Sequence, residues 1–161
     1  MTTAKDERGR STVIELVKLD GIRLVPCGRL DMDTSGALIL TNDGNFVYQV
    51  THPKHEIAKT YVAVIQGNMN EKEKQLMEQG VVIEDYKTSQ AKAVILETRG
   101  KTSKVELTIH EGKNRQVRKM FEAIGKEVVL LHRSKIGRLD VKDLKIGSWR
   151  FLTNEEINSI M

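Results

Sequence analysis

The chain has 161 residues, of which 39% are hydrophobic and 30% charged, a balance that predicts one soluble globular domain with a sizeable core. No apolar run approaches the length of a membrane span, and the first eight residues contain no apolar signal region. The single cysteine, Cys27, excludes an intramolecular disulfide framework, so we expect a reducing, cytoplasmic location. A net charge of +4 allows a nucleic-acid partner without requiring one.

The first third of the chain predicts short helices and one apolar strand. Residues 1–10 are polar and are expected to be mobile. A short helix is expected over residues 13–17, capped by Ser11 or Thr12, and a strand is expected over residues 36–40. Asp43 is a suitable N-cap for a helix that runs to residue 50, and Pro53 terminates that segment.

The rest of the chain predicts mostly strands. Asn70 and Glu73 have the spacing of a helix-capping box, and Gly80 marks the end of the helix that they begin. A further helix is expected over residues 117–124, where the apolar side chains share one face. Strands are expected at residues 61–65, 81–83, 91–96, 104–109, 128–131 and 148–152. This order of elements predicts an α+β fold with a mixed, mainly antiparallel sheet flanked by short helices and loops.

Asp31 lies in the most distinctive segment of the chain, GRLDMDTSGALILTNDG over residues 28–44. The carboxylate follows an apolar residue and precedes turn-forming and hydroxyl residues. A carboxylate held at a strand edge by a tight turn is suited to act as a nucleophile or a general base. Asp33 also suggests the paired carboxylates of a glycosidase, but the turn disfavours such a pair, and we expect Asp33 to support the loop.

A second unusual segment is EGKNRQVRKM over residues 111–120. With Asn114 as N-cap, Arg115, Arg118 and Lys119 fall near the first turn of a helix. Cations there are disfavoured by a few tenths to about 1 kcal/mol each, because a helix N-terminus carries partial positive charge. The misfit indicates a facing anion, either RNA phosphate or a carboxylate. The alternative is a solvated basic face that tolerates the small penalty.

A third segment contains His52-Pro53 and then Lys59-Thr60-Tyr61. Tyr61 offers an aromatic face and a hydroxyl, which would suit a base that has left its stack. On its own, Tyr61 is better explained as a strand tyrosine at a sheet edge, because aromatic residues are enriched in strands. The four histidines and the cysteine lack the spacing of a zinc site, so no metal is expected.

These three segments closely resemble the pseudouridine synthases that act on small-subunit and large-subunit ribosomal RNA, whose motifs are approximately GRLDxxTSGLLLLTNDG, HP…KTY and EGKNRQVRRM. The resemblance runs from about Arg8 to the end of the chain. It implies that Asp31, Tyr61 and Arg118 are catalytic, with Arg118 ion-paired to Asp31 and Tyr61 packed against the target base. The resemblance also implies that a further set of residues contacts RNA: Arg29, Thr34, Lys59, Lys113, Asn114, Arg115 and Gln116.

The resemblance implies that a specific uridine of ribosomal RNA is isomerised to pseudouridine by a cytoplasmic monomer, without a cofactor or metal. The TSG that follows the RLD favours large-subunit (23S) RNA. Family members usually carry a small N-terminal RNA-binding domain of the ribosomal S4 type, so residues 1–161 are expected to be an N-terminally truncated catalytic domain. The alternatives are a non-catalytic RNA-binding module derived from such an enzyme and a base-specific hydrolase. Product analysis separates pseudouridine from unchanged RNA and from free uracil with an abasic site.

Overall fold

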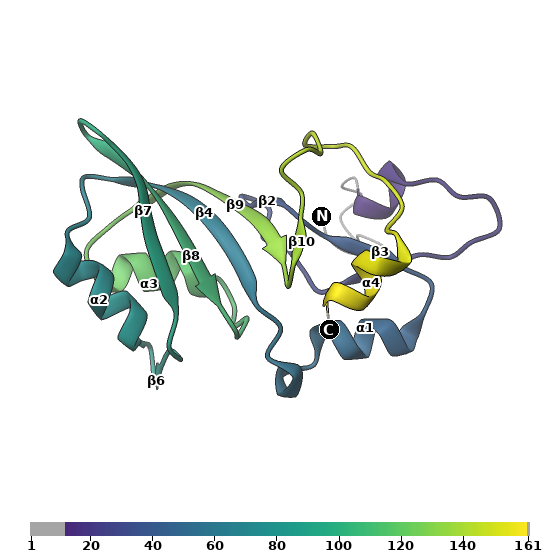
Figure 1. The fold of residues 1–161 in the computed structure, drawn as a ribbon, viewed down its shortest axis with the longest axis horizontal. Coiled ribbons are helices and arrows are strands. Elements are labelled where there is room, and N and C mark those ends of the chain that lie inside the picture. The colour runs from purple at the N-terminus through teal and green to yellow at the C-terminus, as the bar shows by residue number, and fades with distance from the viewer. Residues whose placement is uncertain (1–11, 161) are drawn as a thin grey trace.

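The computed structural model describes residues 12–160, which form an elongated molecule with a long sheet at one end (Figure 1). The N-terminal segment that the sequence predicts to be mobile lies outside the described residues. The helices, with two 3₁₀ turns labelled η, are η1 (Val13–Leu16), α1 (Gly44–Thr51), η2 (Pro53–His55), α2 (Glu71–Gln79), α3 (Gln116–Ala123) and α4 (Asn154–Ile160). The strands are β1 (Val25–Cys27), β2 (Ser35–Gly36), β3 (Ile39–Thr41), β4 (Lys59–Gln66), β5 (Val82–Ile83), β6 (Tyr86–Lys87), β7 (Lys92–Arg99), β8 (Thr102–Ile109), β9 (Val128–Ile136) and β10 (Leu139–Asp140). None of the helices in the described part of the chain has the length and apolar character needed to cross a bilayer.

The main sheet has six strands in the order β10-β9-β4-β8-β7, with β2 paired to the side of β9. The pairs along this order are antiparallel, whereas β2 and β9 run parallel. Two small two-stranded sheets, β1-β3 and β5-β6, lie beside it. This arrangement confirms the predicted α+β fold with a mixed, mainly antiparallel sheet.

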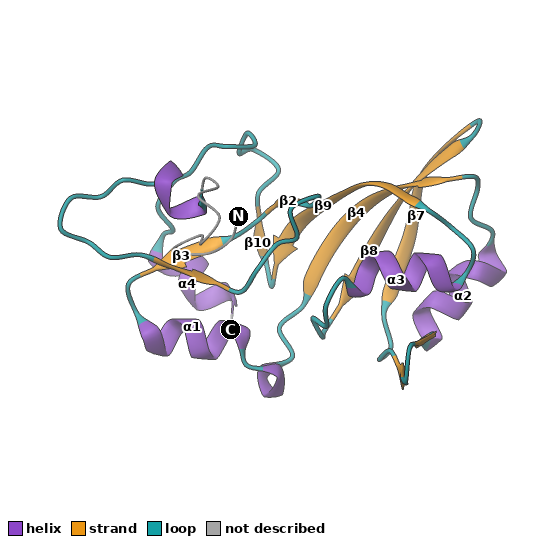
Figure 2. Cartoon of the chain, turned by 180° about the vertical axis from the view of Figure 1, so that it is seen from behind, coloured by secondary structure: helices purple, strands orange, loops and turns teal. Residues whose placement is uncertain are grey.

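The larger core lies between the main sheet and helices α2 and α3, which both stand in front of the sheet in Figure 2. Strand β8 has the predicted alternation, because Val105, Leu107 and Ile109 are buried and the residues between them are not. These side chains pack in one cluster with Ile65 of β4 and Phe121 of α3. Burying each large apolar side chain stabilises the fold by about 1.5–3 kcal/mol. The cluster therefore fixes α3 against the centre of the sheet.

A second, smaller core packs α1 and α4 against the other end of the sheet. Its buried members include Cys27 of β1, Val50 of α1 and Ile160 of α4. Strand β9 links the two cores, because Leu131 belongs to the first cluster and Ile136 to the second. Burial raises the pKa of the Cys27 thiol to about 11, so this thiol stays protonated and unreactive at neutral pH.

The helix starts predicted at Asp43 and at Asn70 are confirmed. The Asp43 carboxylate accepts hydrogen bonds from the backbone N–H groups of Asn45 and Phe46 at the start of α1. Asn70 and Glu73 form the reciprocal capping box at the start of α2, and Gly80 follows the end of that helix. These interactions satisfy backbone donors that have no partner within the helix.

Four predicted elements differ from the structure. The helix expected to end at residue 17 is a single 3₁₀ turn, η1, and Thr12 forms no side-chain cap for it. The strand expected at 36–40 is divided, because β2 pairs with β9 and β3 pairs with β1. The strand expected at 128–131 continues to Ile136. The prediction of a strand at 148–152 is wrong. There, Arg150 forms a two-pronged ion pair with Glu156 over 2.6 and 2.8 Å, and Glu156 also forms a capping box with Thr153 that starts α4.

Candidate active site

Asp31 lies in the loop between β1 and β2, at the first position of a turn. The backbone N–H of Thr34 donates to the carbonyl oxygen of Asp31 over 3.0 Å, which closes the turn over Met32 and Asp33. The Asp31 side chain remains 34% exposed. The Thr34 hydroxyl is buried and has no hydrogen-bond partner within residues 12–160. The turn thus fixes the backbone at Asp31 and leaves its carboxylate partly exposed to solvent.

Arg133 of β9 holds both sides of this loop. Its side chain is 4% exposed, and its Nε donates to the carbonyl of Ala37 over 2.9 Å while Nη1 donates to the carbonyl of Arg29 over 3.4 Å. Gly36 allows the close approach that these bonds need. A Cβ at Gly36 would lie 2.2 Å from the Arg133 carbonyl oxygen, and the backbone there has a φ of +120°. Only glycine fits this position without a shift of the backbone.

Two arginines at the start of α3 face the turn, and they contact Asp33 rather than Asp31. Arg115 donates from Nη1 and Nη2 to the two carboxylate oxygens of Asp33, over 3.1 and 2.9 Å. Arg118 donates from Nη2 to the backbone carbonyl of Asp33 over 2.6 Å, and its Nε lies 3.4 Å from Asp33 Oδ2. The expected Arg118–Asp31 ion pair is not formed within the described chain. Asp31 is instead paired with Arg115, whose Nη1 lies 3.8 Å from Asp31 Oδ2.

Asp33 explains why cations are tolerated at this helix start. Helix α3 follows Arg115, which is the N-cap with a left-handed φ of 51°, so the predicted N-cap, Asn114, is one residue early. The Arg115 hydrogen bonds, helped by the charge of Arg118, lower the pKa of the Asp33 carboxyl. A carboxylate that stays ionised offsets the unfavourable placement of both guanidinium groups.

The same arrangement leaves the Asp31 carboxylate available. No side chain of residues 12–160 donates a hydrogen bond to it, because Asp33 takes both Arg115 donors. A carboxylate without a bound donor keeps its lone pairs for a substrate. Asp31 is therefore placed to attack a carbon or to accept a proton.

Lys59 and Tyr61 come from the first part of β4. Tyr61 lies opposite Arg133 of β9, next to a register shift between the two strands, and packs at the edge of the larger core. Lys59 Nζ lies 3.3 Å from the position that a Cβ on Gly112 would take, so glycine there leaves room for the ammonium group. Burial and the nearby charge of Arg133 lower the pKa of Lys59. No carboxylate of the described residues forms an ion pair with Lys59, which favours an anionic ligand there.

Asp31, Lys59, Tyr61 and the two arginines of the α3 start line one cavity of about 330 Å³, whereas Asp33 lies outside its lining. The sequence-predicted site residues in its lining are Arg29, Asp31, Thr34, Lys59, Tyr61, Lys113, Asn114, Arg115, Gln116 and Arg118. Apolar side chains, among them Ile109, Leu131 and Ile136, form the rest of the wall. Asp31 is the one acidic residue in this lining as far as the structure describes it, against several lysines and arginines. A cavity with an apolar wall and a positive edge suits a flat, uncharged base attached to a phosphate backbone.

Gln116 supports the loop before α3 from inside the protein. Its side chain amide donates to Glu111 Oε1 over 2.7 Å and accepts from the backbone N–H of Lys113 over 3.1 Å. Gln116 is only 3% exposed, and these two bonds give it an internal supporting role; its contact with RNA stays a prediction. Lys113 lies over the ring of Tyr86 in β6, with Nζ 3.8 Å from the ring centroid.

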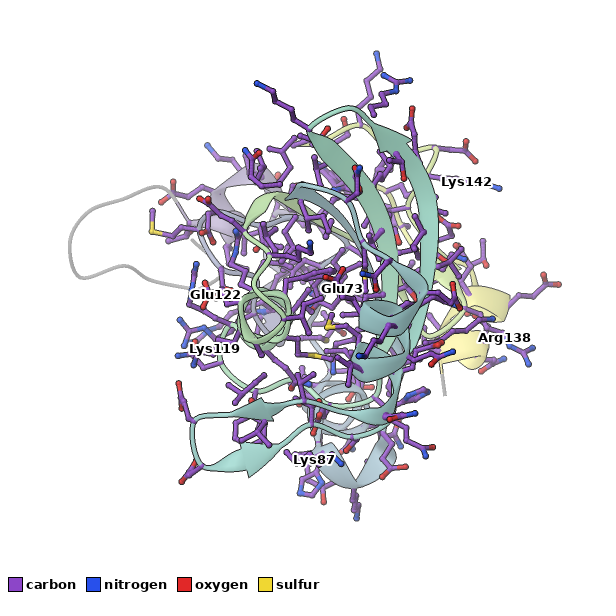
Figure 3. All side chains as sticks on the ribbon, turned by 90° about the vertical axis from the view of Figure 1, so that its left-hand side faces the viewer. Glu73, Lys87, Lys119, Glu122, Arg138 and Lys142 are labelled. Carbon is purple, nitrogen blue, oxygen red and sulfur yellow. The ribbon has the colours of Figure 1, made fainter. Side chains whose placement is uncertain are left out.

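Helix α3 has a second basic contact with the β5-β6 hairpin. Lys119 pairs with Glu84 over 2.7 Å, and Figure 3 shows Lys119 pointing out of the molecule on the side opposite Arg138 and Lys142. Lys119 is outside the cavity lining. Arg115 and Arg118 therefore contact the turn that carries Asp31, whereas the ion pair of Lys119 with Glu84 lies away from that turn.

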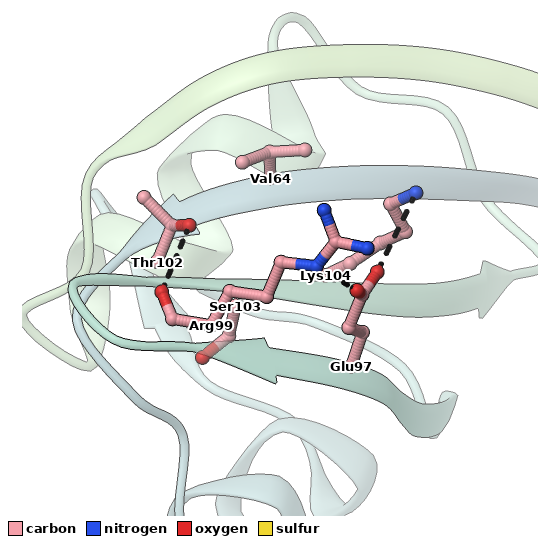
Figure 4. Close-up of a pocket in the computed structure, with 6 residues that line it drawn as sticks. All are labelled: Val64, Glu97, Arg99, Thr102, Ser103 and Lys104. Carbon is pink, nitrogen blue, oxygen red and sulfur yellow. Dashed lines mark hydrogen bonds and ion pairs between the residues drawn. The ribbon is translucent and has the colours of Figure 1, made fainter.

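A smaller depression lies on the β7-β8 hairpin (Figure 4), and its lining shares no residue with the cavity of Asp31. Its volume is about 160 Å³, and its lining includes Val64, Glu97, Arg99 and Lys104. Glu97 of β7 forms ion pairs with Arg99 on the same strand and with Lys104 on β8. These charges are paired with one another at an exposed strand surface, so the depression offers no free reactive group.

Three supporting residues were not predicted from the sequence: Arg133, Gly112 and Tyr86. Arg133 could have been found from the alternation of β9, because it falls on the same face as the buried Leu131. Gly112 lies inside the segment at residues 111–120, but its role depends on Lys59, which is distant in the chain. Tyr86 acts through Lys113, also distant in the chain, and no local pattern marks it.

Comparison with known proteins gives consistent matches. A family model described as RNA pseudouridylate synthase matches residues 3–123. The chain is 45% identical over 162 aligned residues to ribosomal large subunit pseudouridine synthase B of Bacillus subtilis, covering 99% of this chain and 66% of the relative. It is 36% identical to ribosomal small subunit pseudouridine synthase A of Vibrio vulnificus, covering 92% of this chain and 63% of the relative. A crystal structure of a pseudouridylate synthase superposes with a TM-score of 0.86 at 36% identity, covering 93% of this chain and 65% of the other. The chain thus spans about two thirds of the length of these relatives.

Proposed function

Because the chain belongs to the RNA pseudouridylate synthase family, we propose that it isomerises a specific uridine of ribosomal RNA to pseudouridine, with Asp31 as the catalytic carboxylate. The observation that carries the proposal is the convergence of Asp31, Tyr61 and Arg118 on one cavity from three separate elements. A non-catalytic RNA-binding module would not need a carboxylate free of hydrogen-bond donors in the lining of such a cavity.

The reaction breaks the C1′–N1 glycosidic bond and joins the same carbon to C5 of the base. The proton on C5 leaves to solvent and N1 gains one, so substrate and product are isomers and no redox partner is needed. Asp31 acts either as a nucleophile on C1′ or as a base toward a sugar proton. Both roles use a free carboxylate oxygen, and Arg115, 3.8 Å away, stabilises its negative charge.

The other cavity residues bind and orient the flipped nucleotide. Tyr61 supplies an aromatic face that replaces part of the stacking lost when the base leaves the RNA, a loss of a few kcal/mol. Lys59, Lys113 and Arg29 contact phosphate, which offsets that loss. Arg118 is a positioning residue, because it holds the carbonyl of Asp33 and so fixes the turn that carries Asp31.

We further propose that residues 1–161 are the catalytic domain of a longer family architecture and that the target lies in large-subunit RNA. The support is the chain's span of 66% of the Bacillus subtilis relative, which is named for the large subunit and is more similar than the small-subunit relative. The enzyme is proposed to act as a monomer in the cytoplasm, where ribosomal RNA is its partner. Mapping pseudouridines in ribosomal RNA from a deletion strain would identify the uridine.

The test is Asp31→Asn, which keeps the size of the side chain and removes its charge. Tritium release from ribosomal RNA labelled at C5 of uridine should fall by on the order of a thousandfold, whereas RNA binding should persist. Asp143→Asn is the matched control, because Asp143 is exposed and lies outside the cavity lining. Full tritium release by Asp31→Asn would overturn the assignment. Unchanged RNA with the native chain would support the binding module, and free uracil would support a hydrolase.

A further inference from the structure

An aromatic and basic cluster lies in the connection between α1 and β4, and the catalytic proposal does not use it. It consists of Tyr48, His52, Lys54 and His55, and we call it the Tyr48 cluster. The Tyr48 ring centroid lies 4.7 Å from that of His52 and 6.0 Å from that of His55. Lys54 Nζ lies 5.3 Å from the Tyr48 ring centroid. Tyr48 is 48% exposed, so the cluster is a surface feature rather than part of a core.

The cluster is flanked in the chain by two residues of the cavity lining. Thr51, the last residue of α1, and Lys59, the first residue of β4, both line the cavity, and His52, Lys54 and His55 lie between them in the chain. Figure 1 shows α1 leading through this short connection into the lower end of β4. A strand of RNA with one nucleotide in the cavity therefore has neighbouring nucleotides within reach of the cluster.

The chemistry of the cluster suits a nucleotide. His52 Nδ1 accepts the backbone N–H of Lys54 over 3.2 Å, so in the neutral ring the proton is on Nε2, which is free to donate. Tyr48 offers an exposed aromatic ring, and Lys54 offers an ammonium group. A ring for stacking together with cations for phosphate is the combination by which proteins hold single-stranded nucleic acid.

We propose that the Tyr48 cluster binds a nucleotide adjacent to the target uridine, with its base stacked on the Tyr48 ring and its phosphate contacted by Lys54 and His52. This inference rests on the proposed function, because the occupant is the same RNA strand that places a uridine in the cavity. The choice of RNA over a protein partner follows from charge. The cavity lining carries the cations Lys59, Lys113, Arg29 and Arg115, and Lys54 adds a further cation three residues after Thr51 of that lining.

The first test measures the affinity for a fluorescein-labelled ten-nucleotide oligouridylate by anisotropy at fixed salt. Tyr48→Leu should bind about tenfold more weakly, within the range expected for loss of one base stack, whereas Tyr48→Phe should stay within about twofold of the native protein. Phe151→Leu is the matched control, because Phe151 is 69% exposed and contacts Trp149 instead. Circular dichroism melting verifies that each variant is folded.

The second test separates stacking from charge. Lys54→Gln should reduce the slope of log affinity against log salt by about 0.7, the value for one phosphate contact on a single strand, whereas Tyr48→Leu should leave the slope unchanged. RNA with a single abasic nucleotide at successive positions then locates the stacked base. One position beside the target should weaken binding to the native protein and have no effect on Tyr48→Leu.

Equal affinities of native protein and Tyr48→Leu, or an equal loss in Phe151→Leu, would overturn the inference. An affinity loss in Tyr48→Leu that does not respond to any abasic position would also overturn it and would favour a protein partner for the cluster. Tritium release by the native protein is measured on the same preparations. If no pseudouridine is formed while binding still depends on Tyr48, the catalytic proposal fails and the RNA contact stands.

Discussion

Replacing Arg133 with Met tests whether one buried guanidinium holds the loop that carries Asp31. The native side chain donates to the carbonyls of Ala37 and Arg29 over 2.9 and 3.4 Å. A hydrogen bond with one charged partner contributes about 1.5–3 kcal/mol, and the longer of these bonds belongs at or below the lower end. Methionine has similar bulk and removes a buried charge, which recovers part of the loss. We expect a net loss of about 2 kcal/mol, which lowers the melting temperature by about 4–8 °C in a chain of this length.

The effect on turnover should exceed the effect on stability. A loss of about 2 kcal/mol leaves a typical domain folded at 25 °C. The released loop, however, no longer fixes Asp31, and misplacement of a catalytic group by about 1 Å reduces the rate on the order of a hundredfold. The assay is kcat from tritium release at 25 °C, beside a thermal melt. Arg138→Met is the control, because Arg138 is exposed and lies far from α3 in Figure 3. A native melting temperature together with a native kcat in Arg133→Met would refute the reasoning.

Two further substitutions test the backbone and the ion pairs of the site. Gly36→Ala should destabilise the protein by about 2 kcal/mol or more, because its Cβ would lie 2.2 Å from the Arg133 carbonyl oxygen at a φ of +120°. Urea unfolding measures this, with Gly44→Ala as the control since nothing lies within 4 Å of its Cβ, and equal midpoints for both variants would contradict the expectation. Asp33→Asn should lower stability by at most about 1 kcal/mol at pH 7, because the Asp33–Arg115 pair is half exposed. Since the folded-state pKa of Asp33 is lowered, this contribution is present above the unfolded pKa of about 3.9 and is lost as the pH falls through the folded pKa. The urea midpoints of native protein and Asp33→Asn should therefore converge as the pH falls below the unfolded pKa, and a gap that stays constant would count against the pair.

The location of the site could be predicted because short motifs carry its residues. Each motif keeps its side chains within a few positions of one another, and the apolar patterns of β4, β8 and α3 bring the motifs together. The pairing inside the site could not be predicted in the same way. Asp31 and Asp33 are two residues apart in a turn, and the path of that turn decides which carboxylate meets Arg118.

The role of Arg133 escaped prediction for a different reason. Arginine is rarely buried unless it is paired, and the partners here are backbone carbonyls of a loop at the other end of the chain. The strand expected at 148–152 failed because Trp149 and Phe151 alternate with polar residues as in a strand, whereas both are exposed in the structure. The spacing of Thr153 and Glu156 was the better local signal, since it marks the start of α4.

The parallel pairing of β2 with β9 determines how early during synthesis the site around Asp31 can assemble. The side chains of Ser35 and His132, which bond across that pair over 2.7 Å, are 97 positions apart. At about 5–20 residues per second, the ribosome makes β9 roughly 5–20 s after β2. In that interval the nascent chain already contains Asp31, Tyr61 and then Arg118, but it lacks the strand that holds the loop. A message cut short before residue 133 would therefore yield a product with all three motifs intact and no assembled site.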